Sequence, residues 1–248
     1  MRGWFRSLRG KTAARPAARL LQVAPATGGR PIAVTLKRNP RARRLVLSVD
    51  PGDAAPKLVI PPYVSIGEAQ AFLDSRARWL ERRLKALPPR TAFADGATIP
   101  FLGGVLMLRH APDKRGVQRA DDVLHVAGDS RHLSRRTADW LKRAAREEFA
   151  RLAAAKAALA GKPAPRVSIR DPKRQWGSCS VDGVLRLSWR LVLAPPEVLD
   201  YVIAHEVAHL LEMNHGARFW AAVQRLTPHM ATARIWLKRN GHGLLRFG

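Results

Sequence analysis

Apolar and polar residues alternate along much of the first half of the chain, from about residue 31 onwards. Alternation with a period of two, and short apolar runs bounded by turn residues, are typical of β-strands. Asp50-Pro51-Gly52-Asp53 is a turn sequence, and Pro61-Pro62 ends the apolar run that follows it. The strands that this pattern predicts are 32–36, 44–49, 57–62, 101–108 and 122–126.

One stretch of the same region has helical spacing instead. Apolar residues recur every three or four positions from Ile66 to Leu84, and the pattern stops before Pro88-Pro89. Ser65, with Glu68 three residues later, has the spacing of a capping box. We therefore expect residues 31–133 to form a β-rich N-terminal region with one packed helix.

The second half of the chain is mainly helical in pattern. A long helix is expected from Ser134 to about Ala160, because this stretch is rich in Ala, Leu, Lys, Arg and Glu and ends at Gly161. A proline fits the first turn of a helix, so Pro195-Pro196 predicts another helix start. The remaining predicted segments are strands at 166–170 and 183–189 and helices at 217–226 and 231–238. Together the patterns predict an α+β fold whose second region spans residues 134–248.

The helix that begins at Pro195-Pro196 carries the clearest chemical signal. His205 and His209 lie four residues apart, so a helix presents both imidazoles on one side. Glu206 follows the first histidine and can reach a water bound between them. This is the His-Glu-x-x-His arrangement of a helical zinc site with its own general base.

A third zinc ligand is expected from outside this helix. Continuing the helix would place His215 about 240° away from the side that carries His209. Asn214 tolerates left-handed backbone and is a plausible exit from the helix, after which His215 can turn back toward the other two. The alternative third ligands are Glu212, His229 and His242.

Three histidine ligands leave the fourth zinc position to water, which is the pattern of a catalytic site. We expect one catalytic Zn²⁺, held by His205, His209 and His215. The zinc-bound water, activated by Glu206 as general base, would attack a carbonyl or phosphoryl centre.

Charge adds a second feature to the picture. The formal net charge is +25, and no acidic residue occurs from Met1 to Val49. Such an excess attracts anions, namely nucleic acid, acidic membrane surfaces or phosphorylated small molecules. Residues 1–30 show no clear period and are predicted to be a flexible basic arm that could bind nucleic acid non-specifically. An Arg-rich start also resembles a transit peptide, but we favour a solvated arm.

The rest of the composition places few limits on the protein. A single cysteine excludes an internal disulfide, so nothing requires an oxidising compartment, and we expect a cytoplasmic protein. No apolar run approaches the length of a membrane span.

Several short motifs occur in a fixed order between about residues 165 and 240. They are RQWGSCS at 174–180, LSWRL at 187–191, APP at 194–196, DYV at 200–202, HEVAHL at 205–210 and HxxxFW at 215–220. In this combination the chain resembles the YgjP-like zinc metallopeptidases, which are relatives of the SprT-like proteases. The resemblance implies a mixed α/β front region, a zincin-like back region with the HExxH helix, and zinc ligands at His205, His209 and His215. Ser188 departs from the pattern, because asparagine is expected there.

Residues that bind the substrate are harder to assign. A second group that stabilises the developing oxyanion is expected, and Arg174, Gln175 and Tyr201 are candidates. Trp176 and Gly177 either form a sheet edge over the cleft, where a substrate backbone could approach, or serve as a core aromatic and a bulge. Cys179 is expected to be a buried inert residue, with an inhibitory fourth zinc ligand as the alternative.

The sequence thus predicts a zinc hydrolase, foremost a metallopeptidase that acts on extended polypeptide. One alternative is a zinc-dependent hydrolase of nucleoside triphosphates or another phosphoanhydride, because the same activated water serves both reactions. The other is a nucleic-acid-associated protease of the SprT-like kind.

Overall fold

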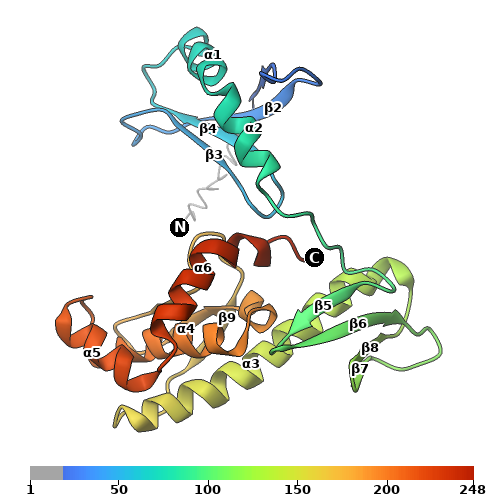
Figure 1. The fold of residues 1–248 in the computed structure, drawn as a ribbon, viewed down its shortest axis with the longest axis vertical. Coiled ribbons are helices and arrows are strands. Elements are labelled where there is room, and N and C mark those ends of the chain that lie inside the picture. The colour runs from blue at the N-terminus through green and yellow to red at the C-terminus, as the bar shows by residue number, and fades with distance from the viewer. Residues whose placement is uncertain (1–18) are drawn as a thin grey trace, which may run out of the picture. The chain divides into compact units, whose positions relative to one another are not determined.

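The computed structural model describes residues 19–248 and shows two compact units (Figure 1). The described part of the first unit covers 19–49 and 55–84, and the second consists of Asp50–Ala54 and Lys85–Gly248. The boundary expected between residues 133 and 134 falls inside the second unit. The strands on its N-terminal side contact the long helix on its C-terminal side, which joins the two segments in one body.

The first unit is a four-stranded sheet with two helices. Its strands are β1 (Arg19–Val23), β2 (Ile32–Arg38), β3 (Val46–Val49) and β4 (Pro56–Ile60), in the order β1-β2-β4-β3. β2 runs parallel to β4, whereas the other two pairs are antiparallel. β4 therefore lies between β2 and β3, although these two strands follow each other in the sequence.

β1 was not predicted, because its residues fall in the expected flexible arm. Leu21 and Val23 are buried, and the strand pairs with β2 along its whole length. Five residues give too short an alternation to be recognised in a basic, Ala-rich stretch. The strand is stabilised by pairing with β2, which the local sequence does not indicate. Residues 24–30 of the expected arm belong to the connection between β1 and β2, and residues 1–18 lie outside the described residues.

The expected single helix of the first unit is two helices, α1 (Ile66–Ser75) and α2 (Ala77–Lys85). α1 begins with the predicted capping box, in which the Ser65 hydroxyl accepts from Glu68 N (3.2 Å) and the Glu68 carboxylate accepts from Ser65 N (2.8 Å). The helices are separated at Arg76, whose backbone N–H bonds to Leu73 O. Helical periodicity continues through a one-residue break, so the sequence pattern does not reveal it.

The second unit begins with a four-stranded sheet that packs against a long helix. The strands are β5 (Thr98–Phe101), β6 (Gly104–His110), β7 (Val117–Ala120) and β8 (Val123–Val126), in the order β5-β6-β8-β7. The helix is α3 (Leu133–Leu159), one residue earlier at each end than predicted. β5 and β7 are short strands at the two edges of the sheet, and neither was predicted: β5 precedes the predicted strand 101–108 and β7 precedes the predicted strand 122–126.

A second sheet and three helices complete this unit. The sheet has the order β10-β11-β9, with β9 (Val167–Arg170), β10 (Gly177–Cys179) and β11 (Leu185–Ser188). A 3-10 helix (Trp189–Leu193) leads into α4 (Pro196–Ala208), α5 (Ala217–Leu226) and α6 (Met230–Leu244). The α+β prediction is confirmed. None of the helices in residues 19–248 is long and apolar enough to cross a membrane.

α4 lies at the centre of the second unit's core. It contacts α3, α5, α6 and β10. Among its fully buried side chains are Val198, Ile203 and Val207. Apolar burial on several sides fixes both the axis and the rotation of this helix, since each methylene buried contributes about 0.8 kcal/mol.

A buried ion pair joins α3 to α4. Lys156 Nζ lies 2.6 Å from Asp200 Oδ1 and donates to Leu226 O at 2.8 Å. Thr227 Oγ1 donates to the other carboxylate oxygen of Asp200 at 2.5 Å. The network therefore links α3, α4 and the end of α5, and both the Lys156 amine and the two Asp200 carboxylate oxygens have partners in it.

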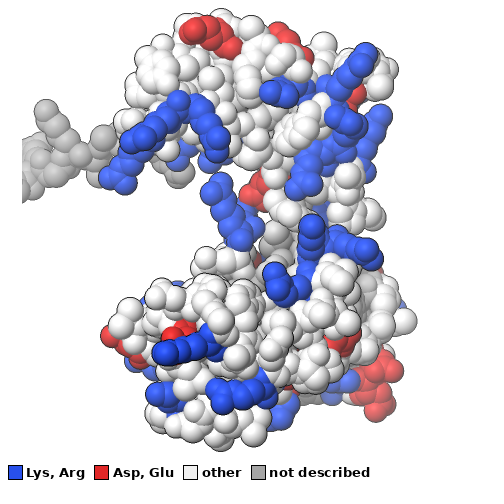
Figure 2. Space-filling view, turned by 60° about the vertical axis from the view of Figure 1, so that its left-hand side comes forward, with Lys and Arg blue, Asp and Glu red and all other residues white. Residues whose placement is uncertain are grey.

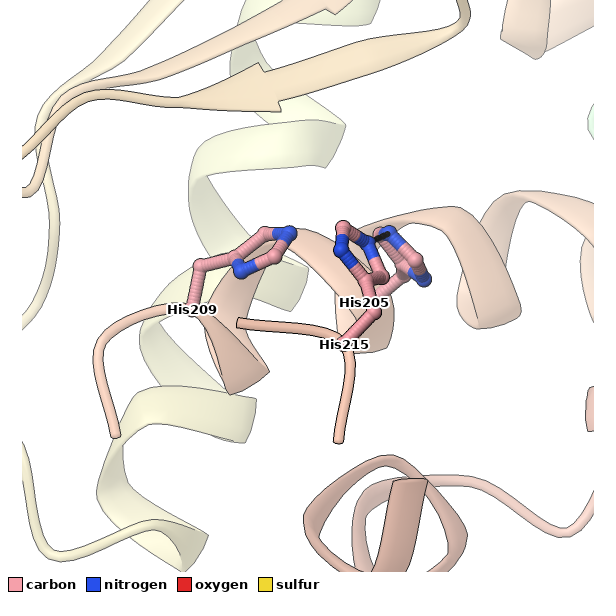
Figure 3. Close-up of side chains that lie close together, drawn as sticks. All are labelled: His205, His209 and His215. Carbon is pink, nitrogen blue, oxygen red and sulfur yellow. Dashed lines mark hydrogen bonds between the residues drawn. The ribbon is translucent and has the colours of Figure 1, made fainter. Parts of the chain in front are cut away.

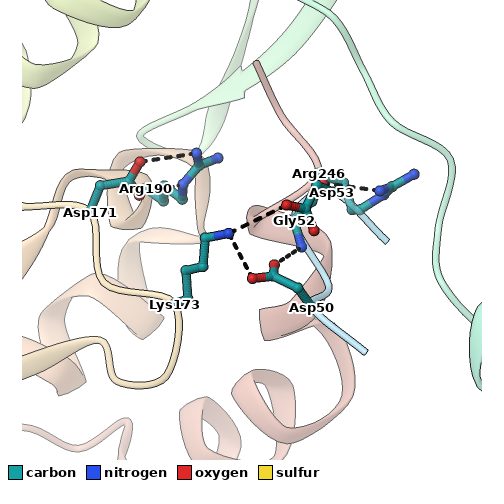
Figure 4. A network of polar contacts seen from close by, with 7 residues as sticks. All are labelled: Asp50, Gly52, Asp53, Asp171, Lys173, Arg190 and Arg246. Carbon is teal, nitrogen blue, oxygen red and sulfur yellow. Dashed lines mark hydrogen bonds and ion pairs between the residues drawn. The ribbon is translucent and has the colours of Figure 1, made fainter. Parts of the chain in front are cut away.

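A second polar network involves the turn Asp50–Ala54 of the same unit (Figure 4). Lys173 Nζ lies 2.6 Å from Asp50 Oδ2 and 3.7 Å from Asp53 Oδ2. Arg246 Nη1 donates to Gly52 O at 3.0 Å. A side chain at Gly52 would come within 3.3 Å of Leu245 O, so the close approach of the turn favours glycine. The turn predicted from sequence thus has a tertiary role that its sequence did not indicate.

We predict that Lys156→Ala lowers the free energy of unfolding by about 2–4 kcal/mol, because it leaves Asp200 and Leu226 O without their buried cationic partner. Lys142→Ala is the control, since the Lys142 side chain is half-exposed on the same helix and lies 3.6 Å from Asp139; it should cost about 0–1 kcal/mol. Urea denaturation of both variants measures the difference. Equal stabilities would contradict a structural role for the buried pair.

Candidate metal centre

The three histidines of the motif lie on α4 and on the turn that follows it. His205 is in the last turn of α4, and His209 is its C-cap, still with helical backbone angles (φ −66°, ψ −16°). The chain then leaves the helix, and the N–H groups of Leu210 and Leu211 bond to carbonyls three residues back. Gly216 is the N-cap of α5, so His215 stands immediately before the next helix.

The imidazoles converge on one point (Figure 3). One ring nitrogen from each of His205, His209 and His215 lies within 4.8 Å of the others. The closest two, Nε2 of His205 and Nε2 of His215, are 3.2 Å apart. Within residues 19–248, this is the sole group of three or more His, Cys, Asp or Glu side chains arranged to hold a metal ion.

The protonation states of His205 and His209 suit a metal ligand. Burial and the neighbouring histidines lower the pKa of His205 to about 4, and burial lowers the pKa of His209. His209 Nδ1 donates to Glu212 O at 3.1 Å, which leaves its Nε2 as the atom with a free lone pair. Neutral imidazoles with lone pairs turned inward fit a divalent cation of the zinc type.

Glu206 follows His205 in α4, and its carboxylate lies against Gly177 of β10. Its side chain is buried, and burial raises its pKa to about 7. A carboxyl group with this pKa can both accept and release a proton near neutral pH. The sequence placed a carboxylate here, whereas its pKa depends on the packing around it.

Gly177 of β10 makes room for that carboxylate. A Cβ atom built on Gly177 would lie 2.5 Å from Glu206 Oε1 and 2.7 Å from Glu206 Cγ. Any side chain at this position would therefore displace Glu206. β10 is an edge strand, because β11 is its single partner in the described sheet. Gly177 thus brings an edge strand of this sheet directly against the carboxylate.

Aromatic rings surround the histidines. The Phe219 ring centroid lies 4.9, 4.5 and 4.5 Å from those of His205, His209 and His215. The Tyr201 ring lies 6.0 Å from the His205 ring, edge-on. The Trp220 ring lies 5.8 Å from both His205 and His215. The sequence analysis listed Phe219 and Trp220 in the motif at 215–220 but did not assign them to the site; their spacing of four and five residues after His215 was the available signal.

The other predicted substrate-binding residues are placed unequally. Arg174 and Gln175 are exposed, and neither makes a hydrogen bond or ion pair with another described residue. Trp176 packs against Gly241 of α6, where a Cβ would lie 3.1 Å from its ring. Of the five candidates, Tyr201 lies next to the His205 ring and Gly177 lies against Glu206.

Cys179 and the alternative third ligands are placed apart from the three imidazoles. Cys179 donates to Ser180 O at 3.4 Å, and burial raises its pKa. Glu212 uses its backbone carbonyl for His209, and its carboxylate lies 3.9 Å from Arg218. His229 is the N-cap of α6, and neither it nor His242 belongs to the cluster.

Comparisons with known proteins place this geometry in a family. A search of curated proteins found no match. Among solved structures, the chain is similar to one described as the crystal structure of the metallopeptidase zymogen of Pyrococcus abyssi abylysin. That match has 24% sequence identity and a TM-score of 0.33, and it covers 36% of this chain and 93% of the other.

The family comparison covers most of the chain. The model of the YgjP-like metallopeptidase domain matches residues 43–240, which include the whole histidine cluster, Glu206 and Gly177. A metallopeptidase is a hydrolase that requires a metal ion, and the three convergent imidazoles could bind one. The chain belongs to the YgjP-like metallopeptidase family.

Proposed function

We propose that the protein is a zinc-dependent peptidase whose catalytic centre consists of His205, His209, His215 and Glu206. The observation that carries this proposal is the convergence of three imidazole nitrogens within 4.8 Å, beside a buried carboxylate. Three neutral nitrogen ligands are typical of catalytic zinc, because they leave one position open. In this proposal α4 and the segment after it have the zincin-like arrangement implied by the motif.

A zinc ion held by the three histidines would polarise a peptide carbonyl and lower the pKa of water at that position toward about 7. The residues of the chain then handle the proton. Glu206 accepts it from the attacking water and returns it to the leaving amine, and the pKa of about 7 matches this dual task. Phe219, which is fully buried beneath the three rings, holds the imidazoles in position and excludes water from below.

The free edge of β10 gives the proposed substrate a place to bind. An extended polypeptide can add to an unpaired strand edge through backbone hydrogen bonds. Since Gly177 abuts Glu206, a peptide paired along Gly177–Cys179 would pass next to the proposed base. Tyr201 is the better placed of the remaining oxyanion candidates, because its ring neighbours His205. These features favour a polypeptide substrate over a phosphoanhydride. A phosphoanhydride would need a cationic side chain at the centre, and Arg174, the candidate for that role, does not contact the histidine cluster.

We predict that Glu206→Gln lowers kcat for a casein or fluorogenic peptide substrate by at least about 100-fold, while the protein still binds one equivalent of zinc. Removal of a general base typically costs 10²–10⁴-fold, and glutamine keeps the size of the side chain. Turnover and metal content, measured on the same preparation, test both halves. Full activity in this variant would refute the role of Glu206 as base.

The ligand assignment is tested by metal content. His205→Ala and His215→Ala should each lose bound zinc and activity, because two imidazoles hold the ion far less tightly than three. His229→Ala is the control and should keep both, since His229 lies outside the cluster. Chelator should abolish hydrolysis by the unaltered protein, and added zinc should restore it. If His215→Ala kept its zinc and His229→Ala lost it, His229 and not His215 would be the third ligand.

Gly177→Ala should reduce kcat/KM by about 10-fold or more, because the added methyl group overlaps the position of Glu206 Oε1. Gly104→Ala is the matched control in another strand, where the nearest atom to an added Cβ is 3.7 Å away. The expected result is loss of activity in the first variant with a folded protein in both, checked by circular dichroism and peptide hydrolysis. If Gly177→Ala is as active as Gly104→Ala, the contact with Glu206 has no role in turnover.

A further inference from the structure

Arg234 of α6 lies beside the candidate metal centre. Its guanidinium carbon lies over the Trp220 ring, 5.1 Å from the centroid. The same ring is 5.8 Å from the rings of His205 and His215. The positive charge of Arg234 also reaches two groups of the centre: it is among the causes that lower the pKa of His205, after burial and the other histidines, and it opposes the burial that raises the pKa of Tyr201.

This guanidinium has no acidic partner among residues 19–248. Some other arginines of the second unit are neutralised by acids. Arg151 pairs with Glu148 at 2.7 Å, and Arg190 with Asp171 at 2.7 Å. Arg218, three residues after His215, lies 3.9 Å from Glu212. Arg234 therefore offers uncompensated positive charge at the edge of the site, although the unit contains carboxylates that neutralise arginines elsewhere.

Packing on Trp220 orients this charge without using its donors. An arginine over an aromatic ring interacts through the face of the guanidinium, and its N–H groups point outward in the guanidinium plane. The contact also limits side-chain motion, so less conformational entropy is lost when a ligand binds. The outward N–H groups of the guanidinium match a carboxylate, which accepts two parallel N–H···O bonds.

The remaining charges near the centre leave this position to Arg234. Glu206 is buried and directed at Gly177, so it does not neutralise the guanidinium. Arg186 is exposed on β11, and its charge acts to lower the pKa of Cys179 on the neighbouring strand β10. Figure 2 shows that Lys and Arg are spread widely over the visible surface, so general attraction of anions is not specific to one residue. What distinguishes Arg234 is its fixed place next to the histidine rings.

We propose that Arg234, held by Trp220, forms a carboxylate-binding subsite next to the catalytic centre, and that it selects polypeptide substrates with an acidic group close to the cleaved bond. The proposal rests on the proposed peptidase function. The carboxylate has two possible sources, an Asp or Glu side chain of the substrate or its C-terminal carboxylate.

The test compares peptides that differ in one group. One series places Glu or Gln at each position within three residues of a reference cleavage site, and a second series ends in a free acid or an amide. The unaltered enzyme should cleave the acidic member of at least one pair with a kcat/KM about five- to tenfold higher, mainly through a lower KM. The series that shows the preference identifies the source of the carboxylate.

Variants then assign the preference to Arg234. In Arg234→Ala the ratio between acidic and neutral peptides should fall to about one, and in Arg234→Glu it should reverse. Arg234→Lys should keep part of the preference, because it retains the charge but loses the planar pair of donors. Arg239→Ala is the matched control, since Arg239 is exposed on the same helix and, among residues 19–248, has neither an aromatic ring nor an acid as partner; its ratio should stay unchanged.

A binding measurement separates failure of this proposal from failure of the proposed function. Calorimetric titration of the Glu206→Gln variant with the same peptide pairs reads binding without turnover. Hydrolysis with equal rates for acidic and neutral peptides overturns the subsite and leaves the peptidase function standing. Absence of all peptide hydrolysis rejects the peptidase function, and the subsite is then rejected as well if the peptide pairs bind equally. An equal loss of preference in Arg239→Ala would also overturn it, since the effect would then be general surface charge.

Discussion

The burial of α4 is the constraint on which the rest of the second unit depends. Helices and a strand surround it, and apolar side chains such as Val198, Ile203 and Val207 face them. Two titratable groups of α4 lie at the candidate metal centre in this environment, namely the His205 imidazole and the Glu206 carboxyl. Burial shifts both toward their neutral forms, because the charged forms lose hydration. An element that is otherwise purely structural therefore holds a neutral nitrogen ligand and a proton acceptor in fixed positions.

Other interactions of this unit keep that helix in place. Lys156 and Asp200 join α4 to α3, and Thr227 extends the network to the segment after α5. α5 begins next to His215 and supplies Phe219, which touches all three imidazoles. A site needs its side chains within a fraction of an ångström of the productive geometry, and rigid elements achieve this better than loops. Here two helices and a strand edge meet around the histidines, so the site combines rigidity with access.

Charge is distributed differently in the two units. Described residues of the first unit include twelve Lys and Arg but three Asp and Glu, and all three acids have other hydrogen-bond partners. Glu81, for example, accepts from the backbone and hydroxyl of Thr27. In the second unit Arg151, Lys156 and Arg190 are paired with acids, whereas Arg234, next to the histidine rings, has no acidic partner among residues 19–248. Net charge alone indicates attraction to anions in general, whereas position decides which anion can be bound specifically.

The sequence by itself determined the family, the α+β class, and most helices and central strands, because these depend on local periodicity and short motifs. The spacing of His205, Glu206 and His209 was enough to predict ligands and a base. The sequence did not reveal β1, because that strand depends on pairing with β2. It did not reveal the break at Arg76 either, because the helical period continues through it.

The tertiary structure alone decided what surrounds the histidines. The segment after α4 brings His215, not His229 or His242, to the first two rings. The pKa of Glu206 follows from burial among residues distant in sequence. The contact of Gly177 with Glu206 and the position of Arg234 over Trp220 arise from elements that meet through packing. Contacts between distant segments leave no periodic signal in the sequence, and for that reason they become visible only in the folded chain.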